Sequence, residues 1–272
     1  KKYISPGSWF SLEYPDNWCE FEDSEDCFLF YNPDKWTGNF RISAYRGNSS
    51  AYANECLEDE LHQVRGAKKV KVGLWDCAYS SESFQENGVW YTTHIWVTGR
   101  GEISVECSFT VAKGESPKAG EAIVVSLKVR NVSDKPVKEV IPVRILEINQ
   151  INENYDWAVS TVKKTDQGLT GTAADLENLQ KVIDSGRFNP KQRQAWESFG
   201  TAFGVILVNE MDGMEWVTVI DGQKESPALR FRDSKVMVNP ISLIWDKAKS
   251  GQPCDLKAEF ERIKNEVEAV MD

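Results

Sequence analysis

The chain has 272 residues, of which 41% are hydrophobic, and its formal net charge is −10. This length is sufficient for two domains that each bury a core of their own. Acidic residues exceed basic ones in both halves of the chain, so neither half predicts the cationic patch that phosphate binding requires, and no nucleic-acid partner is expected. No apolar run approaches the ~20 residues that cross a bilayer, so no membrane span is expected.

The chain contains few residues suited to metal or redox chemistry. Its six cysteines stand at irregular spacings without a C-x-x-C pair, and it has two histidines. This inventory predicts neither a zinc site nor a bound cofactor. Because several cysteines fall inside strand or helix patterns, we expect reduced thiols and a cytoplasmic protein. The alternative is an exported protein whose signal peptide precedes Lys1.

The first half of the chain shows strand periodicity interrupted by one helix. In the stretch WFSLEYPDNW, residues 9–18, a Pro-Asp-Asn corner breaks an alternating strand and a second extended segment follows. Between residues 53 and 64 apolar residues recur at helical spacing, and Gly66 ends that pattern. Residues 8–111 are therefore predicted to form an antiparallel α+β meander of about seven strands with one inserted helix.

The clearest strand pattern is a hairpin at the end of this region. Apolar residues alternate over residues 89–97 and again over 103–111, with Gly99–Gly101 between them. Glycines supply the positive φ angles of a three-residue hairpin loop. With such a loop, His94 pairs with Glu106 on the face opposite the alternating apolar residues.

That opposite face carries tryptophans, of which the chain has ten. Trp90 and Trp96 fall on it, and Trp36 falls in a loop. Tryptophan is enriched at protein-binding surfaces. The hypothesis is an exposed strip that docks a partner and comprises Trp90, His94, Trp96 and Glu106. The alternative is that a flanking helix covers this face and the tryptophans belong to the core.

The segment over residues 115–132 is compatible with two structures. Alternation of Ile123, Val125 and Leu127 with other residues predicts a strand. Pro117 at a helix start, followed by apolar residues at helical spacing, predicts a helix instead. Periodicity leaves both structures open.

The order of elements, the opening FSLEYPDNW (residues 10–18) and the closing AIVVSL (residues 122–127) resemble the PsbP-like fold. That fold is shared by an extrinsic photosystem protein, a Ran-binding nuclear import factor and bacterial chaperones of secreted effectors. The resemblance covers residues 3–130 and implies an antiparallel sheet flanked by helices. It favours a helix over residues 117–130 and a first domain over residues 1–132.

Residues 131–142 are polar and contain two prolines, which predicts the connection between domains. The second domain, residues 143–272, is predicted to be a mostly helical α+β domain with a small sheet. Its helix starts are marked by capping residues, namely Thr172 with Asp175, Asn189 before Pro190, Asn239 and Asp255. Its predicted core lies on one helix face and comprises Trp196, Phe199, Phe203 and Ile206.

The block FGxxxxNEMDGMEW (residues 203–216), followed by PALR and NPISLI, resembles an uncharacterised bacterial domain. This resemblance covers residues 145–250. It implies a helix, a short sheet and a helix in that order. It implies no activity and no catalytic residue.

The residues suggest no catalytic arrangement. Neither histidine stands beside a glycine-rich nucleophile turn, and no G-x-x-x-x-G-K is present. We therefore expect a non-enzymatic protein that binds another protein, as an adaptor, an effector chaperone or a toxin-neutralising partner. The alternative from another class is a hydrolase whose carboxylates are drawn from Asp156, Asp166, Asp175, Glu177 and Asp184. The sequence predicts no oligomeric state.

Overall fold

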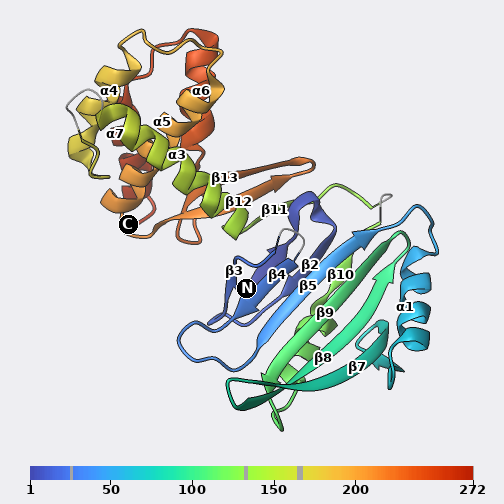
Figure 1. Ribbon diagram of the computed structural model, residues 1–272. Coiled ribbons are helices and arrows are strands. Elements are labelled where there is room, and N and C mark those ends of the chain that lie inside the picture. Colours follow the sequence, from blue (N-terminus) through green and yellow to red (C-terminus); the bar gives the residue numbers. More distant parts are fainter. Residues whose placement is uncertain (25–26, 132–133, 164–167, 272) are drawn as a thin grey trace. The chain divides into compact units, whose positions relative to one another are not determined.

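The chain folds into two compact units, Lys1–Val137 and Lys138–Asp272, each with its own hydrophobic core (Figure 1). We call them unit 1 and unit 2. The computed structural model describes residues 1–24, 27–131, 134–163 and 168–271. Among these residues, no helix is both long and apolar enough to cross a membrane. The predicted fold class, an antiparallel α+β domain followed by a mostly helical α+β domain, is confirmed.

Unit 1 is built on a seven-stranded antiparallel sheet with the strand order β3-β4-β5-β9-β8-β7-β6. Its strands are β3 (Cys19–Phe21), β4 (Cys27–Tyr31), β5 (Asn39–Arg46), β6 (Lys68–Val72), β7 (Trp75–Glu86), β8 (Val89–Arg100) and β9 (Ile103–Ala112). A smaller sheet has the order β1-β2-β10, with β1 (Lys2–Ile4), β2 (Phe10–Glu13) and β10 (Lys128–Val129). The helices are α1 (Tyr52–Gln63) and α2 (Lys118–Ser126).

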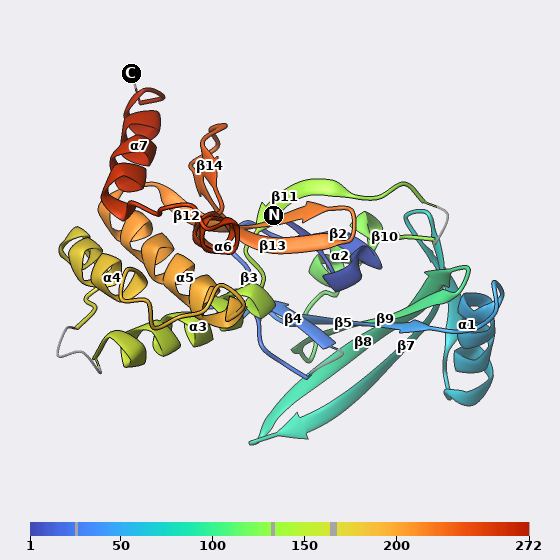
Figure 2. The same cartoon turned by 90° about the horizontal axis from the view of Figure 1, so that it is seen from above.

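The two faces of the large sheet are covered differently. On one face, the small sheet and α2 enclose the main core, which includes Phe10, Phe30, Phe40, Phe109 and Ile123 (Figure 2). On the other face, α1 packs over one end only, where Leu57 contacts Ala78 and Val97. The rest of this second face is left without a covering helix among the described residues. A half-covered sheet face is where a ligand can reach the fold.

The segment predicted as a helix over residues 117–130 is helical only as far as Ser126. Leu127 leaves the helix with φ −56° and ψ 136°, and Lys128–Val129 pairs with β2. The Ser126 hydroxyl accepts a hydrogen bond from the Glu13 backbone N–H at 2.8 Å, so it ties the helix end to β2. Residues 128–129 therefore pair with the edge of β2 instead of forming the last turn of the predicted helix.

The predicted register of the β8–β9 hairpin is wrong. Arg100 pairs with Ile103 across a two-residue turn, so His94 pairs with Phe109, and Glu106 pairs with Val97. The shift is by an odd number of residues, and such a shift moves each side chain to the opposite face.

The positions of Gly99 and Gly101 explain why the predicted register of the β8–β9 hairpin is wrong. Gly101 has φ +63° and is the first central residue of the turn. Gly99 belongs to the strand instead, and a Cβ built there would lie 2.3 Å from the Ile103 carbonyl oxygen and 2.9 Å from Ala53 Cβ. Gly99 therefore allows a close approach to α1, and it forms no part of the turn.

Unit 2 combines a four-stranded antiparallel sheet, order β11-β12-β13-β14, with helices. Its strands are β11 (Lys138–Pro142), β12 (Met214–Asp221), β13 (Lys224–Phe231) and β14 (Met237–Val238). Its helices are α3 (Ile145–Lys163), α4 (Leu176–Ile183), α5 (Arg193–Glu210), α6 (Pro240–Ser250) and α7 (Leu256–Glu268), besides a 3-10 turn at Ala173–Asp175. Residues 138–142, assigned to the connection from the sequence, form an edge strand of this sheet.

Three of the four capping predictions for unit 2 are confirmed. The fourth, Asn189, is wrong, because α5 begins at Arg193 with Gln192 at its N-cap, and the Asn189 side chain instead accepts a hydrogen bond from the Lys191 N–H at 2.8 Å in the preceding turn. Thr172 and Asp175 form a reciprocal capping box. Asn239 accepts a hydrogen bond from the Ser242 N–H at 2.9 Å, and Asp255 accepts one from the Ala258 N–H at 2.9 Å. The predicted core face is buried as well, because Trp196, Phe199, Phe203 and Ile206 are all at most 7% exposed.

A buried ion cluster lies where α3 begins. The Arg144 side chain is 1% exposed, and its guanidinium donates hydrogen bonds to Glu147, with Nε–Oε2 at 2.9 Å, and to Glu225 Oε2 at 2.7 Å. The Thr218 hydroxyl also donates to Glu147, at 3.1 Å. Burial opposes the charge of Arg144, but the two carboxylates hold its pKa above the ordinary value. A buried cation of this kind destabilises the fold unless carboxylate partners compensate its charge.

Candidate functional site

The four residues of the predicted docking strip do not form one surface. Trp96 is 1% exposed and His94 is 9% exposed, so both belong to the core face. Trp90 shares that face but lies near the strand end, where it is 47% exposed. Glu106 lies on the opposite face, where partial burial and the nearby Glu60 raise its pKa. The alternative interpretation, that this face is core, is correct for Trp96 and His94.

His94 is a buried titratable group in this core. Its Nδ1 lies 2.8 Å from the Tyr79 hydroxyl, and its ring stacks on Trp96 with centroids 6.2 Å apart. Burial lowers the pKa of His94 below 6.5, and the carboxylate of Glu121 on α2 opposes this effect in part. The neutral imidazole is therefore the form that the fold stabilises.

The lowered pKa of His94 makes the free energy of unfolding depend on pH. At pH values between the lowered pKa and about 6.5, the unfolded chain binds the proton more readily than the folded chain. Stability is therefore full above about pH 6.5 and falls as the pH drops toward the folded pKa. The expected result is a loss of unfolding free energy between pH 7.5 and 5.5 that is smaller in His94→Gln. Urea titration at the two pH values measures it.

The chain contains a matched control for this prediction. His62 is the other histidine, and it is exposed on α1. His62→Gln should retain the pH dependence of the unsubstituted chain. An equal pH dependence in His94→Gln and the unsubstituted chain would show that His94 does not contribute.

A cleft of about 560 Å³ lies on the second face of the large sheet, at the end that α1 leaves uncovered. Its floor is made by side chains that point to this face from neighbouring strands: Leu29 and Tyr31 on β4, Asn39 and Arg41 on β5, and Thr110 on β9. Its far wall is formed by Phe84, Glu86 and Tyr91 on the β7–β8 hairpin, and by Trp36 in the loop before β5. We call it the aromatic cleft.

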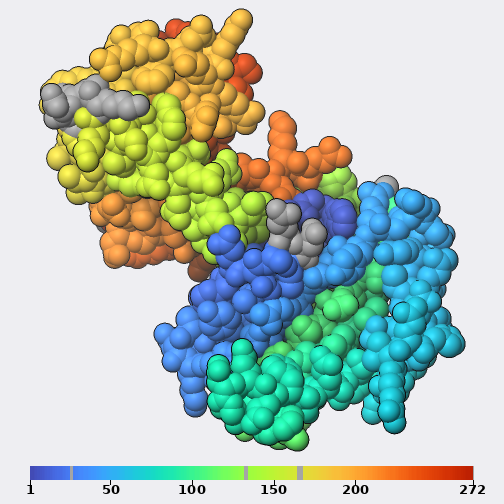
Figure 3. Space-filling model, in the orientation of Figure 1, coloured from blue at the N-terminus to red at the C-terminus, as the bar shows by residue number. Residues whose placement is uncertain are grey.

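The far wall of the aromatic cleft contains three aromatic rings, of which Tyr91 contacts the other two. Tyr91 packs edge-on with Trp36, with centroids 5.7 Å apart, and stacks on Phe84 at 5.6 Å. Trp36 is 44% exposed and Phe84 is 39% exposed. In Figure 3 the β4–β5 segment in blue and the tip of the β7–β8 hairpin in teal border this end of the sheet. Large aromatic side chains exposed together in a cleft are typical of a binding surface.

The polar groups of the aromatic cleft carry opposite charges. Arg41 forms an ion pair with Asp23, with Nε–Oδ2 at 2.8 Å, so its charge is already balanced. Glu82, Phe84 and Glu86 alternate along β7 on the cleft face. Within the described part of the chain neither of these two glutamates pairs with a cation. The hairpin side of the cleft is therefore negatively charged.

The sequence alone does not predict the aromatic cleft, because its residues come from five strands and a loop. The only available signal is Trp36, a tryptophan in a polar loop. Chemically, the cleft offers apolar contact area, hydrogen-bonding groups at Asn39 and Thr110, and unbalanced carboxylates. These groups are the kinds that contact and orient a ligand.

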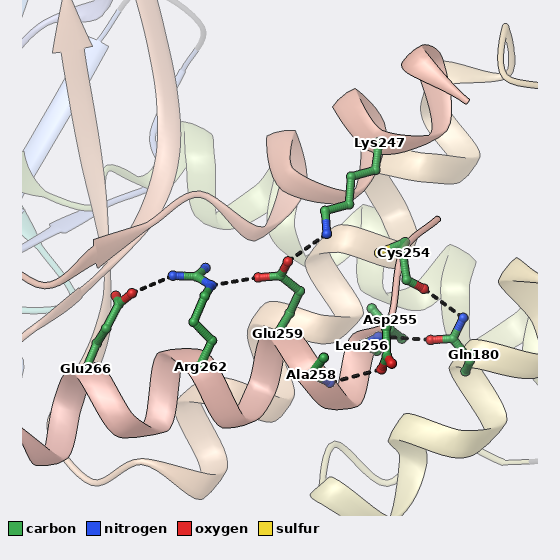
Figure 4. Close-up of polar contacts among 9 residues, drawn as sticks. All are labelled: Gln180, Lys247, Cys254, Asp255, Leu256, Ala258, Glu259, Arg262 and Glu266. Atoms are coloured by element: carbon green, nitrogen blue, oxygen red, sulfur yellow. Dashed lines mark hydrogen bonds and ion pairs between the residues drawn. The ribbon is translucent and has the colours of Figure 1, made fainter. Parts of the chain in front are cut away.

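A second hollow, of about 800 Å³, lies in unit 2 between α4 and α7. Gln180 holds this region together: its amide donates to the Cys254 carbonyl at 2.8 Å and accepts from the Leu256 N–H at 2.9 Å (Figure 4). Beside it, Lys247 on α6 contacts Glu259 on α7 at 2.6 Å. Burial opposes ionisation of Glu259, but its bonded cations lower its pKa. Lys247 and Glu259 are not among the residues that line this hollow, whereas Glu177 and Lys181, which do line it, pair with each other at 2.6 Å.

Three of the five carboxylates considered for a hydrolase, Asp175, Glu177 and Asp184, are engaged with different partners. Asp175 accepts from the backbone N–H groups of residues 170–172. Glu177 pairs with Lys181, and Asp184 accepts from Gln180. Asp166 lies outside the described residues. The described residues also include no group of three or more His, Cys, Asp or Glu side chains placed to hold a metal ion.

Comparison with known protein families shows which family the chain belongs to. Residues 1–152 match a domain of unknown function (DUF3805), and residues 175–260 match another domain of unknown function (DUF3806). Because the first match spans more than half of the chain, the chain belongs to the DUF3805 family. No curated protein matches it. The family description gives no activity.

The chain is similar to solved structures to different extents. The chain is similar to a crystal structure from Bacteroides thetaiotaomicron VPI-5482, at 50% identity and a TM-score of 0.92, over 96% of this chain and 97% of that one. Cyanobacterial PsbP from Synechocystis sp. PCC 6803 matches at 12% identity and a TM-score of 0.28, over 48% of this chain and 92% of that one. LpqN, which is involved in cell envelope biogenesis of Mycobacterium tuberculosis, matches at 14% identity and a TM-score of 0.29, over 45% and 83%. The predicted PsbP-like resemblance is thus supported in part, by matches of low identity that each cover less than half of this chain.

Proposed function

We propose that the chain is a non-enzymatic binding protein that holds an extended segment of a partner protein in the aromatic cleft. The observation that carries this proposal is the exposure of Trp36 and Phe84 beside Tyr91 on the part of the sheet that α1 does not cover. Aromatic side chains dominate the energy of protein interfaces, and aromatic-lined grooves bind extended segments. An adaptor, an effector chaperone or a toxin-neutralising partner would each use such a surface.

The dimensions of the cleft support a short extended segment. The side chains of the cleft run from β4 to β7 across four strand spacings, or about 19 Å at ~4.8 Å per spacing. A segment of about six residues has this length at ~3.3 Å per residue. The floor residues Asn39 and Thr110 would hydrogen-bond its backbone, while the rings would contact its side chains.

The experiment is site-specific photo-crosslinking in cells. A photoreactive amino acid placed at Phe84 points into the cleft, whereas one placed at Trp90, on the opposite face of the same hairpin, is the matched control. The expected result is one cross-linked polypeptide at position 84, no such product at position 90, and loss of the product in Tyr91→Ala. Equal cross-linking at both positions would contradict the proposal.

The compartment forms part of the same proposal. The six cysteines are unpaired. Burial raises the pKa of the Cys77 thiol to about 11, which keeps it protonated in the core. Unpaired thiols support a cytoplasmic chain. A cross-linked partner that resides in the cytoplasm would support this location, and a partner from the cell envelope would contradict it.

A further inference from the structure

We infer that the partner segment in the aromatic cleft presents a cationic side chain, arginine or lysine, to the rings of Trp36, Tyr91 and Phe84, between the carboxylates of Glu82 and Glu86. This inference rests on the proposed function and specifies the chemistry of the ligand. It is argued from the charge of the cleft and from the faces of its rings.

Charge gives the first reason. Arg41, the cation on the cleft floor, is neutralised by Asp23 at 2.8 Å. Glu82 and Glu86 stand on either side of Phe84 along β7, each about 6.6 Å from it along the strand. Both are exposed, and in the described ranges neither has a cationic partner. A cation placed over Phe84 would therefore meet a carboxylate on each side.

The rings give the second reason. Trp36 meets Tyr91 at 88° and Phe84 stacks on Tyr91 at 28°. Tyr91 is therefore half-buried between two rings that are themselves 44% and 39% exposed. Exposed faces of tryptophan and phenylalanine attract ammonium and guanidinium groups. A guanidinium also hydrogen-bonds carboxylates in a planar, bidentate way.

Contacts between a cationic side chain and an aromatic ring also occur elsewhere in the chain. On the opposite face of the β7–β8 hairpin, Lys113 Nζ lies 4.6 Å from the Trp90 ring centroid. In unit 2, Arg193 lies 4.5 Å from the Trp245 ring while it pairs with Glu197 at 2.8 Å. Arg193 thus combines an aromatic face with a carboxylate, which is the combination that the aromatic cleft offers to a partner.

The test is selection of a random dodecapeptide display library on the full chain, followed by titration calorimetry with one enriched peptide. The expected peptides contain arginine or lysine beside apolar residues. The charge variant is the double substitution Glu82→Gln and Glu86→Gln. It should bind the enriched peptide about tenfold more weakly, since it loses two ion pairs to one cation. Replacing the arginine of the peptide by citrulline should weaken binding to the unsubstituted chain by a similar factor.

The matched control is Glu55→Gln with Glu58→Gln, which makes the same charge change on exposed positions of α1. It should bind the peptide within about twofold of the unsubstituted chain. Enriched peptides without a basic residue, or undiminished binding by the charge variant, would overturn the inference. If binding nevertheless depends on Trp36 and Tyr91, the proposed function stands. Binding that is insensitive to both Trp36→Ala and Tyr91→Ala would overturn the proposed function too.

Discussion

Replacing Trp96 with alanine should destabilise unit 1 by about 3–5 kcal/mol, the usual cost of deleting a buried aromatic side chain. Trp96 is 1% exposed on β8 and is paired with Cys107 on β9. Its ring lies 5.7 Å from that of Tyr79 and 6.2 Å from that of His94. Deletion therefore leaves a cavity under the middle of the sheet. Urea unfolding followed by hydrogen exchange over residues 89–112 measures unit 1 apart from unit 2.

Trp90 is the matched control, because it is the same residue type on the same strand and the same face. It is 47% exposed, and Lys113 covers its ring at 4.6 Å. Trp90→Ala should cost about 1 kcal/mol or less. If Trp96→Ala does not fold, Trp96→Phe should fold with a smaller loss, of about 1–3 kcal/mol. Similar small losses for Trp90→Ala and Trp96→Ala would show that Trp96 is not a core residue.

The contrast between these two tryptophans shows what periodicity can and cannot predict. The alternation over residues 89–97 predicts a strand, and β8 is that strand. It does not predict which face is the main core, because both faces of this sheet bury side chains. Val97 packs under α1, while Trp96 packs in the larger core on the other face. The prediction placed these residues wrongly relative to β9 because it assumed a three-residue loop, whereas the turn has two residues.

Structural features that depend on residues close together in the sequence were predicted more reliably than contacts between distant residues. Asn239 and Asp255 cap helices because the capping hydrogen bond joins residues three apart in sequence, which a short window contains. Arg144 shows the opposite case. Glu147 lies three residues away, but the other partner, Glu225, is 81 residues away, and the sequence around Arg144 does not indicate that its guanidinium is buried. The aromatic cleft is likewise assembled by strand order, since β9 lies between β5 and β8.

Replacing Phe203 with alanine should destabilise unit 2 by about 3–5 kcal/mol, near the upper end of that range. Phe203 is fully buried on α5. The cost of a cavity depends on how far the surroundings collapse into it, and α5 cannot move far. A Cβ built on Gly200 would lie 2.5 Å from the Ile241 Cα, and one on Gly204 would lie 2.6 Å from the Trp216 ring. The α6 backbone and β12 thus already rest against this helix.

Hydrogen exchange over residues 193–210 during urea unfolding measures the loss for Phe203→Ala in unit 2 alone. Leu146→Ala is the control, because Leu146 is 55% exposed on α3 and its truncation should cost about 0.5 kcal/mol or less. Phe203→Leu should lie between the two, since leucine fills part of the same space. A loss below about 1 kcal/mol for Phe203→Ala would mean that α5 relaxes into the cavity, against the close packing at Gly200 and Gly204.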